Sequence, residues 1–152
     1  MDNRDYNQIL EKIDKLNNQL NDKQGKTLDL DLVKRIVIRL KSFDCTQCEN
    51  DLYKLSEYIN YIYENQNSLE RQKLKEYNKF IEQIKTHLQK KHGLFTEGYY
   101  LSIYMSLGIS VGLMLGLAFF EHWALGMCFG MSTGIAIGSG IDADHKKKGK
   151  II

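Results

Sequence analysis

The sequence contains no proline among its 152 residues. Proline breaks helices and is frequent in turns, so its absence suits long helices and makes a turn-rich all-β domain unlikely. The first residues, MDNRDYNQ, have no apolar run behind them, so we expect no cleavable signal peptide. Insertion into a membrane would then depend on a segment further along the chain.

Signatures of enzymes and of nucleic-acid binding are also missing. No glycine-rich loop follows a strand-like segment, and the carboxylates are scattered over polar helix faces, so we expect no enzymatic activity. Residues 1–98 contain 17 Lys and Arg against 16 Asp and Glu, a net charge of +1. Nucleic-acid binding usually needs a strongly basic face, so this balance argues against such a partner.

One long apolar stretch, residues 99–141, dominates the second half of the sequence. It consists of two apolar segments, 99–120 and 123–141, separated by Glu121 and His122, which are its only acidic or basic residues. Each segment has about the length that a helix needs to cross a hydrocarbon core of roughly 30 Å. The sequence therefore predicts a transmembrane hairpin.

Residues at the ends of the two segments predict the orientation of the hairpin. Aromatic residues, which favour membrane interfaces, lie at both ends: Tyr99, Tyr100, Tyr104, Phe119, Phe120 and Trp123. Lysines flank the hairpin on its open side only: Lys85, Lys90, Lys91, Lys146, Lys147, Lys148 and Lys150. The positive-inside rule then places both termini in the cytoplasm. We therefore expect a helical domain at 1–98 and a basic tail at 142–152, both on the cytoplasmic side of the plasma membrane.

Glycines recur at every fourth residue in both apolar segments. They are Gly108, Gly112 and Gly116 in the first segment, and Gly126, Gly130, Gly134 and Gly138 in the second. Four residues advance a helix by about 400°, so each series lies on one face. Lipid provides no hydrophobic drive for helices to associate, and small residues act by letting the backbones approach closely. We expect a glycine-zipper hairpin that packs through these faces.

A second series of small residues lies on the opposite face of each segment. It comprises Ser102, Ser106 and Ser110, followed by Ala124, Cys128, Ser132, Ala136 and Gly140. One small face per helix is enough to close a hairpin, so the second series predicts a homo-oligomer in the membrane, with Cys128 in a packing role. The alternative is a compact hairpin that remains monomeric.

Apolar residues in the first 98 positions recur at helical spacing. They predict amphipathic helices at about 6–22, 29–42, 46–64 and 68–92, the first of them with the seam of a short coiled coil. Thr46 and Glu49 form a capping-box pattern at the start of the third helix, and Asn67 with Glu70 marks the start of the fourth. A helical bundle followed by the hairpin gives an all-α fold.

Four potential metal ligands occur in two pairs. Cys45 and Cys48 form a C-x2-C pair, and His87 and His92 form an H-x4-H pair, spacings that fall within those of Cys2His2 zinc sites. If the last two helices are antiparallel, both pairs lie at the same end of the bundle. Three interpretations remain open: a zinc site, cysteines buried in the apolar seam with solvated histidines, and redox chemistry at a helix N-terminus.

The stretch from His87 to Lys150 includes HLQKKHGLFTEGYYLSIYMSLGISVG and LGMCFGMSTGIAIGSGIDADHKKKGK. It resembles a group of small, largely uncharacterised bacterial membrane proteins. Members pair a cytoplasmic helical segment with a glycine-zipper hairpin that ends in an Asp- and Lys-rich tail. The richness of the chain in Lys, Asn, Ile and Tyr also fits an AT-rich bacterial genome. The resemblance implies the two-pass topology and no activity.

Two functions from different classes follow from these patterns. The first is a non-enzymatic, oligomeric anchor in the lipid bilayer, holding a helical interaction or sensing domain whose helices within 1–92 would bind a cytoplasmic protein. The second is an oligomeric channel or membrane-permeabilising protein. Its narrow lumen would be lined by the hydroxyl groups of Ser102, Ser106, Ser110 and Ser132.

Overall fold

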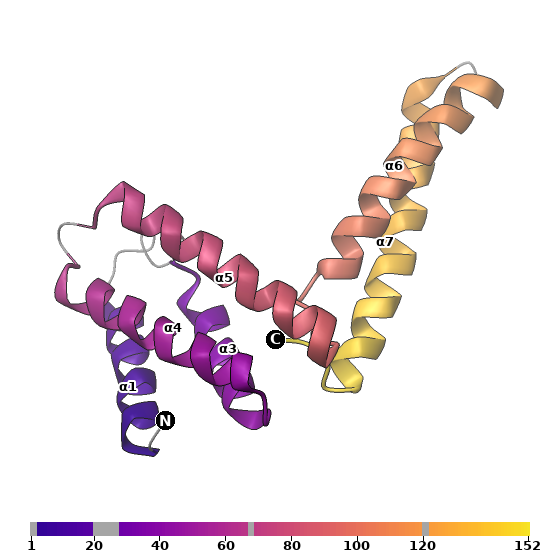
Figure 1. Cartoon of the computed structure of the whole chain (residues 1–152). Helices are drawn as coiled ribbons and strands as arrows, with labels where there is room; N and C mark the ends of the chain where they lie inside the picture. The colour runs from indigo at the N-terminus through magenta and orange to yellow at the C-terminus, as the bar shows by residue number, and fades with distance from the viewer. Residues whose placement is uncertain (1–2, 20–27, 67–68, 120–121) are drawn as a thin grey trace. The chain divides into compact units, whose positions relative to one another are not determined.

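The structure is a computed structural model that describes residues 3–19, 28–66, 69–119 and 122–152. The regular structure of this part is helical, with one isolated β-bridge between Phe95 and Ile151, which confirms the predicted all-α class. Figure 1 shows the helices α1 (Asn3–Gln19), α3 (Leu30–Ser42), α4 (Thr46–Glu64), α5 (Arg71–His92), α6 (Tyr99–Phe119) and α7 (Trp123–Lys147).

The chain divides into two compact units, residues 1–87 with Ile152 and residues 88–151. In the first unit, each helix buries its apolar face in one core, with α1, α3 and α4 lying together (Figure 1). Full burial of an aliphatic side chain is worth about 1.5–3 kcal/mol, so this core holds the bundle together. Its members include Ile9, Ile13, Leu16, Val33, Ile36, Val37, Leu40, Leu52, Leu55, Ile59, Ile62, Tyr77, Ile81 and Ile84.

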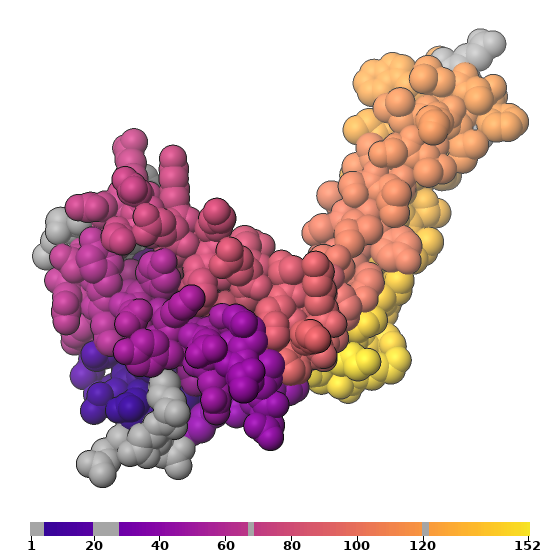
Figure 2. Space-filling view, viewed as in Figure 1, coloured from indigo at the N-terminus to yellow at the C-terminus, as the bar shows by residue number. Residues whose placement is uncertain are grey.

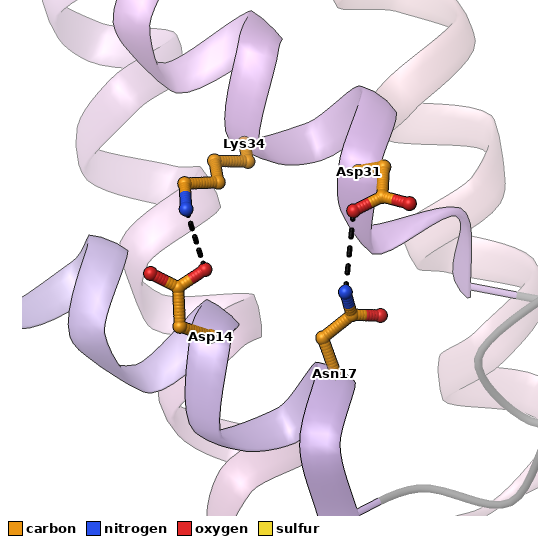
Figure 3. A network of polar contacts seen from close by, with 4 residues as sticks. All are labelled: Asp14, Asn17, Asp31 and Lys34. Carbon is orange, nitrogen blue, oxygen red and sulfur yellow. Dashed lines mark hydrogen bonds and ion pairs between the residues drawn. The ribbon is translucent and has the colours of Figure 1, made fainter.

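Two polar contacts connect α1 and α3 at the edge of this core. The ammonium group of Lys34 donates to Asp14 Oδ1 at 2.6 Å, and the side-chain amide of Asn17 donates to Asp31 Oδ1 at 3.2 Å (Figure 3). Both contacts are exposed, and exposed ion pairs contribute only about 0.2–1 kcal/mol. The apolar core therefore provides most of the stability, and these contacts mainly favour one register of the two helices.

The start of α4 differs from the predicted capping box. Cys45 is the N-cap residue: its backbone is extended, and its carbonyl accepts a hydrogen bond from the backbone N–H of Glu49 at 3.1 Å. The N-cap residue is therefore a cysteine and not Thr46. The predicted capping box is wrong, because Thr46 already lies in the first turn of the helix. Residues 20–22, the predicted end of the first helix, and Asn67, the predicted start of the fourth, lie outside the described residues.

In the second unit, α6 and α7 form an antiparallel hairpin whose backbones touch at glycines (Figure 1). A Cβ atom added to Gly130 would collide with the carbonyl oxygen of Gly108 and lie 2.8 Å from the Cα of Gly112. Only glycine allows the two backbones to approach so closely. The remaining glycines of the two series also face the backbone of the opposite helix: Gly116, Gly126, Gly134 and Gly138.

The large apolar side chains of the hairpin point away from this contact. Leu107, Met114 and Leu117 are 54%, 63% and 57% exposed, and side chains of α6 form much of the hairpin surface in Figure 2. Among the described residues, α6 and α7 are the two helices long and apolar enough to span a membrane, yet only 11% and 22% of their apolar parts are buried. Phe120, the predicted end of the first segment, and Glu121, in the predicted break, lie outside the described residues.

The carboxylate of Asp142 caps the start of α6. It accepts hydrogen bonds from the backbone N–H groups of Tyr100 at 3.2 Å and Leu101 at 3.0 Å. The first N–H groups of a helix have no partner within the helix, and a negative charge there also interacts favourably with the helix dipole. A residue of α7 thus provides hydrogen-bond acceptors for the first free N–H groups of α6 at the open end of the hairpin.

The segment predicted as a basic tail is ordered. Helix α7 continues past the predicted end of the apolar segment at Ile141 to Lys147, and the chain then turns back. The N–H of Lys150 donates to the carbonyl of His145 at 2.9 Å, and the N–H of Phe95 donates to the carbonyl of Lys150 at 2.9 Å. These bonds hold the tail beside the residues that precede α6.

We expect Gly130→Ala to destabilise the hairpin by about 1–3 kcal/mol, because the added methyl group must push α6 and α7 apart. Unfolding of the full chain in mixed micelles, followed during an SDS titration, measures this change. Gly140→Ala is the matched control, since a Cβ there meets nothing within 4 Å. Equal losses for the two variants would contradict the glycine contact.

Asp142→Ala should cost about 1 kcal/mol in the same titration, the usual value of a helix N-cap. Asp144→Ala serves as the control on the same helix. The carboxylate of Asp144 forms an exposed ion pair with Lys148 at 2.6 Å, so its loss should change the unfolding free energy by less than about 0.5 kcal/mol. A smaller effect for Asp142→Ala than for Asp144→Ala would show that the carboxylate does not cap α6.

Candidate metal centre

The two ligand pairs come from the start of α4 and the end of α5. Cys45 is the N-cap residue of α4, Cys48 lies in its first turn, and His87 and His92 lie in the last two turns of α5. Residues 65–70 connect the two helices, which run antiparallel (Figure 1). The connection therefore places the beginning of one helix beside the end of the other, as the sequence predicted.

The distances between the ligand atoms suit one metal ion. The Nε2 atom of His87 lies 3.4 Å from the sulfur of Cys48 and 3.6 Å from the sulfur of Cys45. One ligand atom from each of the four residues, His92 included, lies within 4.8 Å of all the others. With metal–sulfur and metal–nitrogen distances of about 2.3 and 2.05 Å, tetrahedral sulfur and nitrogen ligands would be about 3.6 Å apart. The cluster could therefore hold a metal ion.

The end of α5 explains how two histidines five residues apart reach one site. His92 is the last residue of the helix, and Gly93 follows in the left-handed conformation with φ 62°. The N–H of Gly93 donates to the carbonyl of Gln89 at 3.2 Å, which forms the αL type of C-cap. Glycine adopts this conformation without steric cost. The helix thus ends at the residue that provides the fourth ligand.

Burial and hydrogen bonding give the two thiols different proton affinities. Cys48 is completely buried, whereas Cys45, His87 and His92 are half-buried. The backbone N–H of Cys48 stabilises the thiolate of Cys45 and lowers the pKa of that thiol. Burial raises the pKa of the Cys48 thiol to about 12, and Cys45 adds to this shift. A bound cation would reverse the preference at Cys48, since its charge stabilises both thiolates.

The donor set limits the chemistry of the site. Two thiolates and two imidazoles in a tetrahedral arrangement suit borderline or soft ions such as zinc. A set of four protein ligands leaves no open position for water or substrate, which is the arrangement of structural metal sites and not of catalytic ones. The site is therefore suited to holding α4 against α5.

Sequence reasoning missed Asp51, which lies one turn after Cys48 on α4. Asp51 is a charged residue that is only 6% exposed. Its carboxylate accepts a hydrogen bond from the side-chain amide of Gln47 at 2.8 Å. The Cys48 N–H dominates the pKa of Cys45 and burial dominates the pKa of Cys48, and the charge of Asp51 adds a smaller effect against ionisation of both thiols. The same charge would attract a cation. A carboxylate in an otherwise apolar seam was the signal in the sequence.

The small residues on the second face of the hairpin are exposed, Cys128 among them. The hydroxyl groups of the four candidate lumen serines donate to carbonyls of their own helices. The acceptors are Gly98 for Ser102 at 2.9 Å, Ile103 for Ser106 at 2.8 Å, Ser106 for Ser110 at 2.9 Å and Cys128 for Ser132 at 2.7 Å. The single hairpin does not bring these groups together into one site.

Metal analysis of the purified full chain tests the cluster directly. We expect about one ion per chain in the wild type and less than about 0.2 in Cys48→Ser, because loss of one of four ligands removes a large part of the binding energy. Cys128→Ser is the matched control and should keep the ion, since this cysteine lies on the exposed face of α7. A wild-type content below about 0.2 would exclude a metal centre.

Comparison of the chain with protein-family models, curated proteins and solved structures finds no match. The comparisons therefore assign neither a family nor an activity. What can be inferred about function rests on the four-ligand cluster and on the apolar hairpin.

Proposed function

We propose that this chain is a non-enzymatic membrane protein whose hairpin anchors a helical interaction or sensing domain at the plasma membrane. The outward-facing apolar surface of α6 and α7 is the observation that carries the proposal. So large an apolar surface is unusual on a soluble monomer. The 21 residues of α6 span about 31 Å at 1.5 Å per residue, which matches a bilayer core.

The lysines on the open side of the hairpin support a cytoplasmic location for both termini. Lys146, Lys147, Lys148 and Lys150 follow the second span, and no lysine or arginine lies in the connection around His122. Short cytoplasmic flanks carry an excess of such residues. We propose that the bundle and the ordered tail are cytoplasmic, and that a cytoplasmic protein binds the helices within residues 1–92.

The cluster of Cys45, Cys48, His87 and His92 supports a structural zinc ion. Residues 65–70 already join α4 and α5 at one end, and a zinc ion would join them at the other. Binding energy at such a site adds to folding energy, which matters for a bundle with a modest core. Buried cysteines without metal and a redox-active pair are the competing interpretations, and metal analysis separates them from zinc.

The second small face supports packing between copies of the hairpin. The glycines at the centre of each helix meet the facing helix within one chain, whereas Cys128, Ser132 and Ala136 remain exposed on α7. Small exposed residues allow a neighbouring helix to approach closely in lipid. We therefore propose a homo-oligomer in which each hairpin is closed by glycines and copies meet through the second face.

A pore is the alternative function, and the serine contacts weigh against it. Hydroxyl groups in a water-filled lumen can bond to water, but those of Ser102, Ser106, Ser110 and Ser132 already donate to their own backbones. Such intrahelical bonds make serine tolerable in lipid or at a helix–helix contact. The anchor needs nothing further from these residues.

The mass of the particle in lipid nanodiscs tests assembly. We expect a discrete oligomer for the wild type and monomers for Ser132→Leu with Ala136→Leu, since two large side chains would separate the copies. Ile135→Leu is the control, because an exposed large side chain is replaced by one of similar volume. A wild-type monomer would contradict the oligomer and leave the anchor intact.

Two further measurements distinguish the anchor from its alternatives. The anchor predicts that the chain stays in the membrane fraction after alkaline washing and that its liposomes pass no ions. Recovery of the folded chain in detergent-free buffer would contradict membrane anchoring. Ion flux abolished by Ser106→Leu with Ser110→Leu, in a chain that remains folded, would establish the pore in its place.

A further inference from the structure

The base of the hairpin, which we define as residues 88–98 and 142–152, carries an excess of positive charge. It contains six lysines and three carboxylates, a net charge of +3 with histidine neutral. The carboxylates are Glu97, Asp142 and Asp144, and the lysines are Lys90, Lys91, Lys146, Lys147, Lys148 and Lys150. An excess of positive charge beside an apolar hairpin favours binding of a negatively charged partner.

Each carboxylate of the base already has a partner. Glu97 binds Lys146 at 2.7 Å, Asp144 binds Lys148 at 2.6 Å, and Asp142 caps the first turn of α6. Among the described residues, neither Lys147 nor Lys150 forms an ion pair with a carboxylate, and Lys147 acts on Asp144 through its charge alone. Both ammonium groups can therefore bind a partner from outside the chain.

The backbone holds these two lysines in fixed positions. Lys147 is the last residue of α7, and Lys150 is fixed by its hydrogen bonds to His145 and Phe95. The ring of His145 packs against Tyr100 and Phe95, with centroid distances of 4.7 and 5.2 Å. The two lysines thus lie on an ordered backbone, and the aromatic rings packed against His145 in the same segment are of the kind that favours the membrane interface.

We propose that Lys147 and Lys150 bind the phosphate groups of anionic phospholipids in the leaflet at the base of the hairpin. The inference rests on the proposed membrane anchoring. Lysine clusters directly beside a transmembrane helix attract anionic lipids, and each lysine contributes about a fivefold preference. The acyl chains of the same lipid would lie on the exposed apolar side chains of α6 and α7, such as Ile103 and Ile137.

The chemistry distinguishes a lipid from a soluble phosphate. Both present the same negative oxygens, but only a lipid adds apolar contact with the hairpin and is held at the height of the base by the bilayer. Soluble phosphate would have to compete with water for these ammonium groups, because they are exposed. Within the described residues, no enclosed pocket surrounds them. We therefore assign the site to the lipid headgroup.

Native mass spectrometry of the full chain in detergent, with added phosphatidylglycerol or phosphatidylcholine, tests the assignment. We expect the wild type to bind phosphatidylglycerol at least about tenfold more tightly, and Lys147→Gln with Lys150→Gln to lose most of that preference. Lys147→Arg with Lys150→Arg should retain it. Lys75→Gln with Lys79→Gln, an exposed pair on α5, removes the same charge from the first unit and should also retain it.

Each outcome decides the matter. Equal affinity of the wild type for the two lipids, or an unchanged preference in the glutamine variant, would overturn the proposal. If the glutamine variant does not fold, a preference of the wild type that survives high salt would overturn it, because headgroup pairing is electrostatic.

Displacement of the lipid by millimolar inorganic phosphate would assign the site to soluble anions. If the chain needs detergent but shows no lipid preference, the lipid site is wrong and the proposed anchoring stands. If the chain is soluble without detergent, both the lipid site and the proposed anchoring are wrong.

Discussion

The close approach of two backbones, at Gly112 and Gly130, determines how the hairpin is built. Because residues without side chains occupy the inner face, the large apolar side chains have only the outer face left. A pair of helices in water shows the opposite order, with large apolar residues inside. The contact therefore leaves an apolar surface on two helices that are long and apolar enough to span a membrane. The polar contacts of Asp142, Glu97 and Lys146 are correspondingly confined to its base.

The first unit is built differently, since its helices bury their apolar side chains against one another. Its apolar seams provide the core, and α5 is a long helix that residues 65–70 connect to α4 at one end. Cys48 and His87 meet at the other end. A metal ion there would join the two helices at the end opposite their connection.

Periodicity in the sequence was enough to predict the helical class, the two candidate spans and a Cys2His2 cluster, because each depends on spacing along one helix and on a short connection. Other features depend on contacts between distant residues. The cap that Asp142 provides for α6 and the pairing of Phe95 with Lys150 join positions more than 40 residues apart. No local pattern encodes them. The capping-box prediction failed for a related reason: the pattern at Thr46 does not specify which residue is the N-cap.

The end of α5 lies between the ligand cluster and the glycine-packed hairpin along the chain. His92 is a metal-ligand candidate and the last residue of the helix, and six residues, 93–98, separate it from α6. Gly93 and Gly98 are both left-handed, with φ 62° and 77°, and Phe95 between them is bonded to Lys150. The connection is therefore short and fixed at several points. A metal ion bound at His92 would therefore act together with the C-cap at Gly93, and both would hold the end of α5 at this residue.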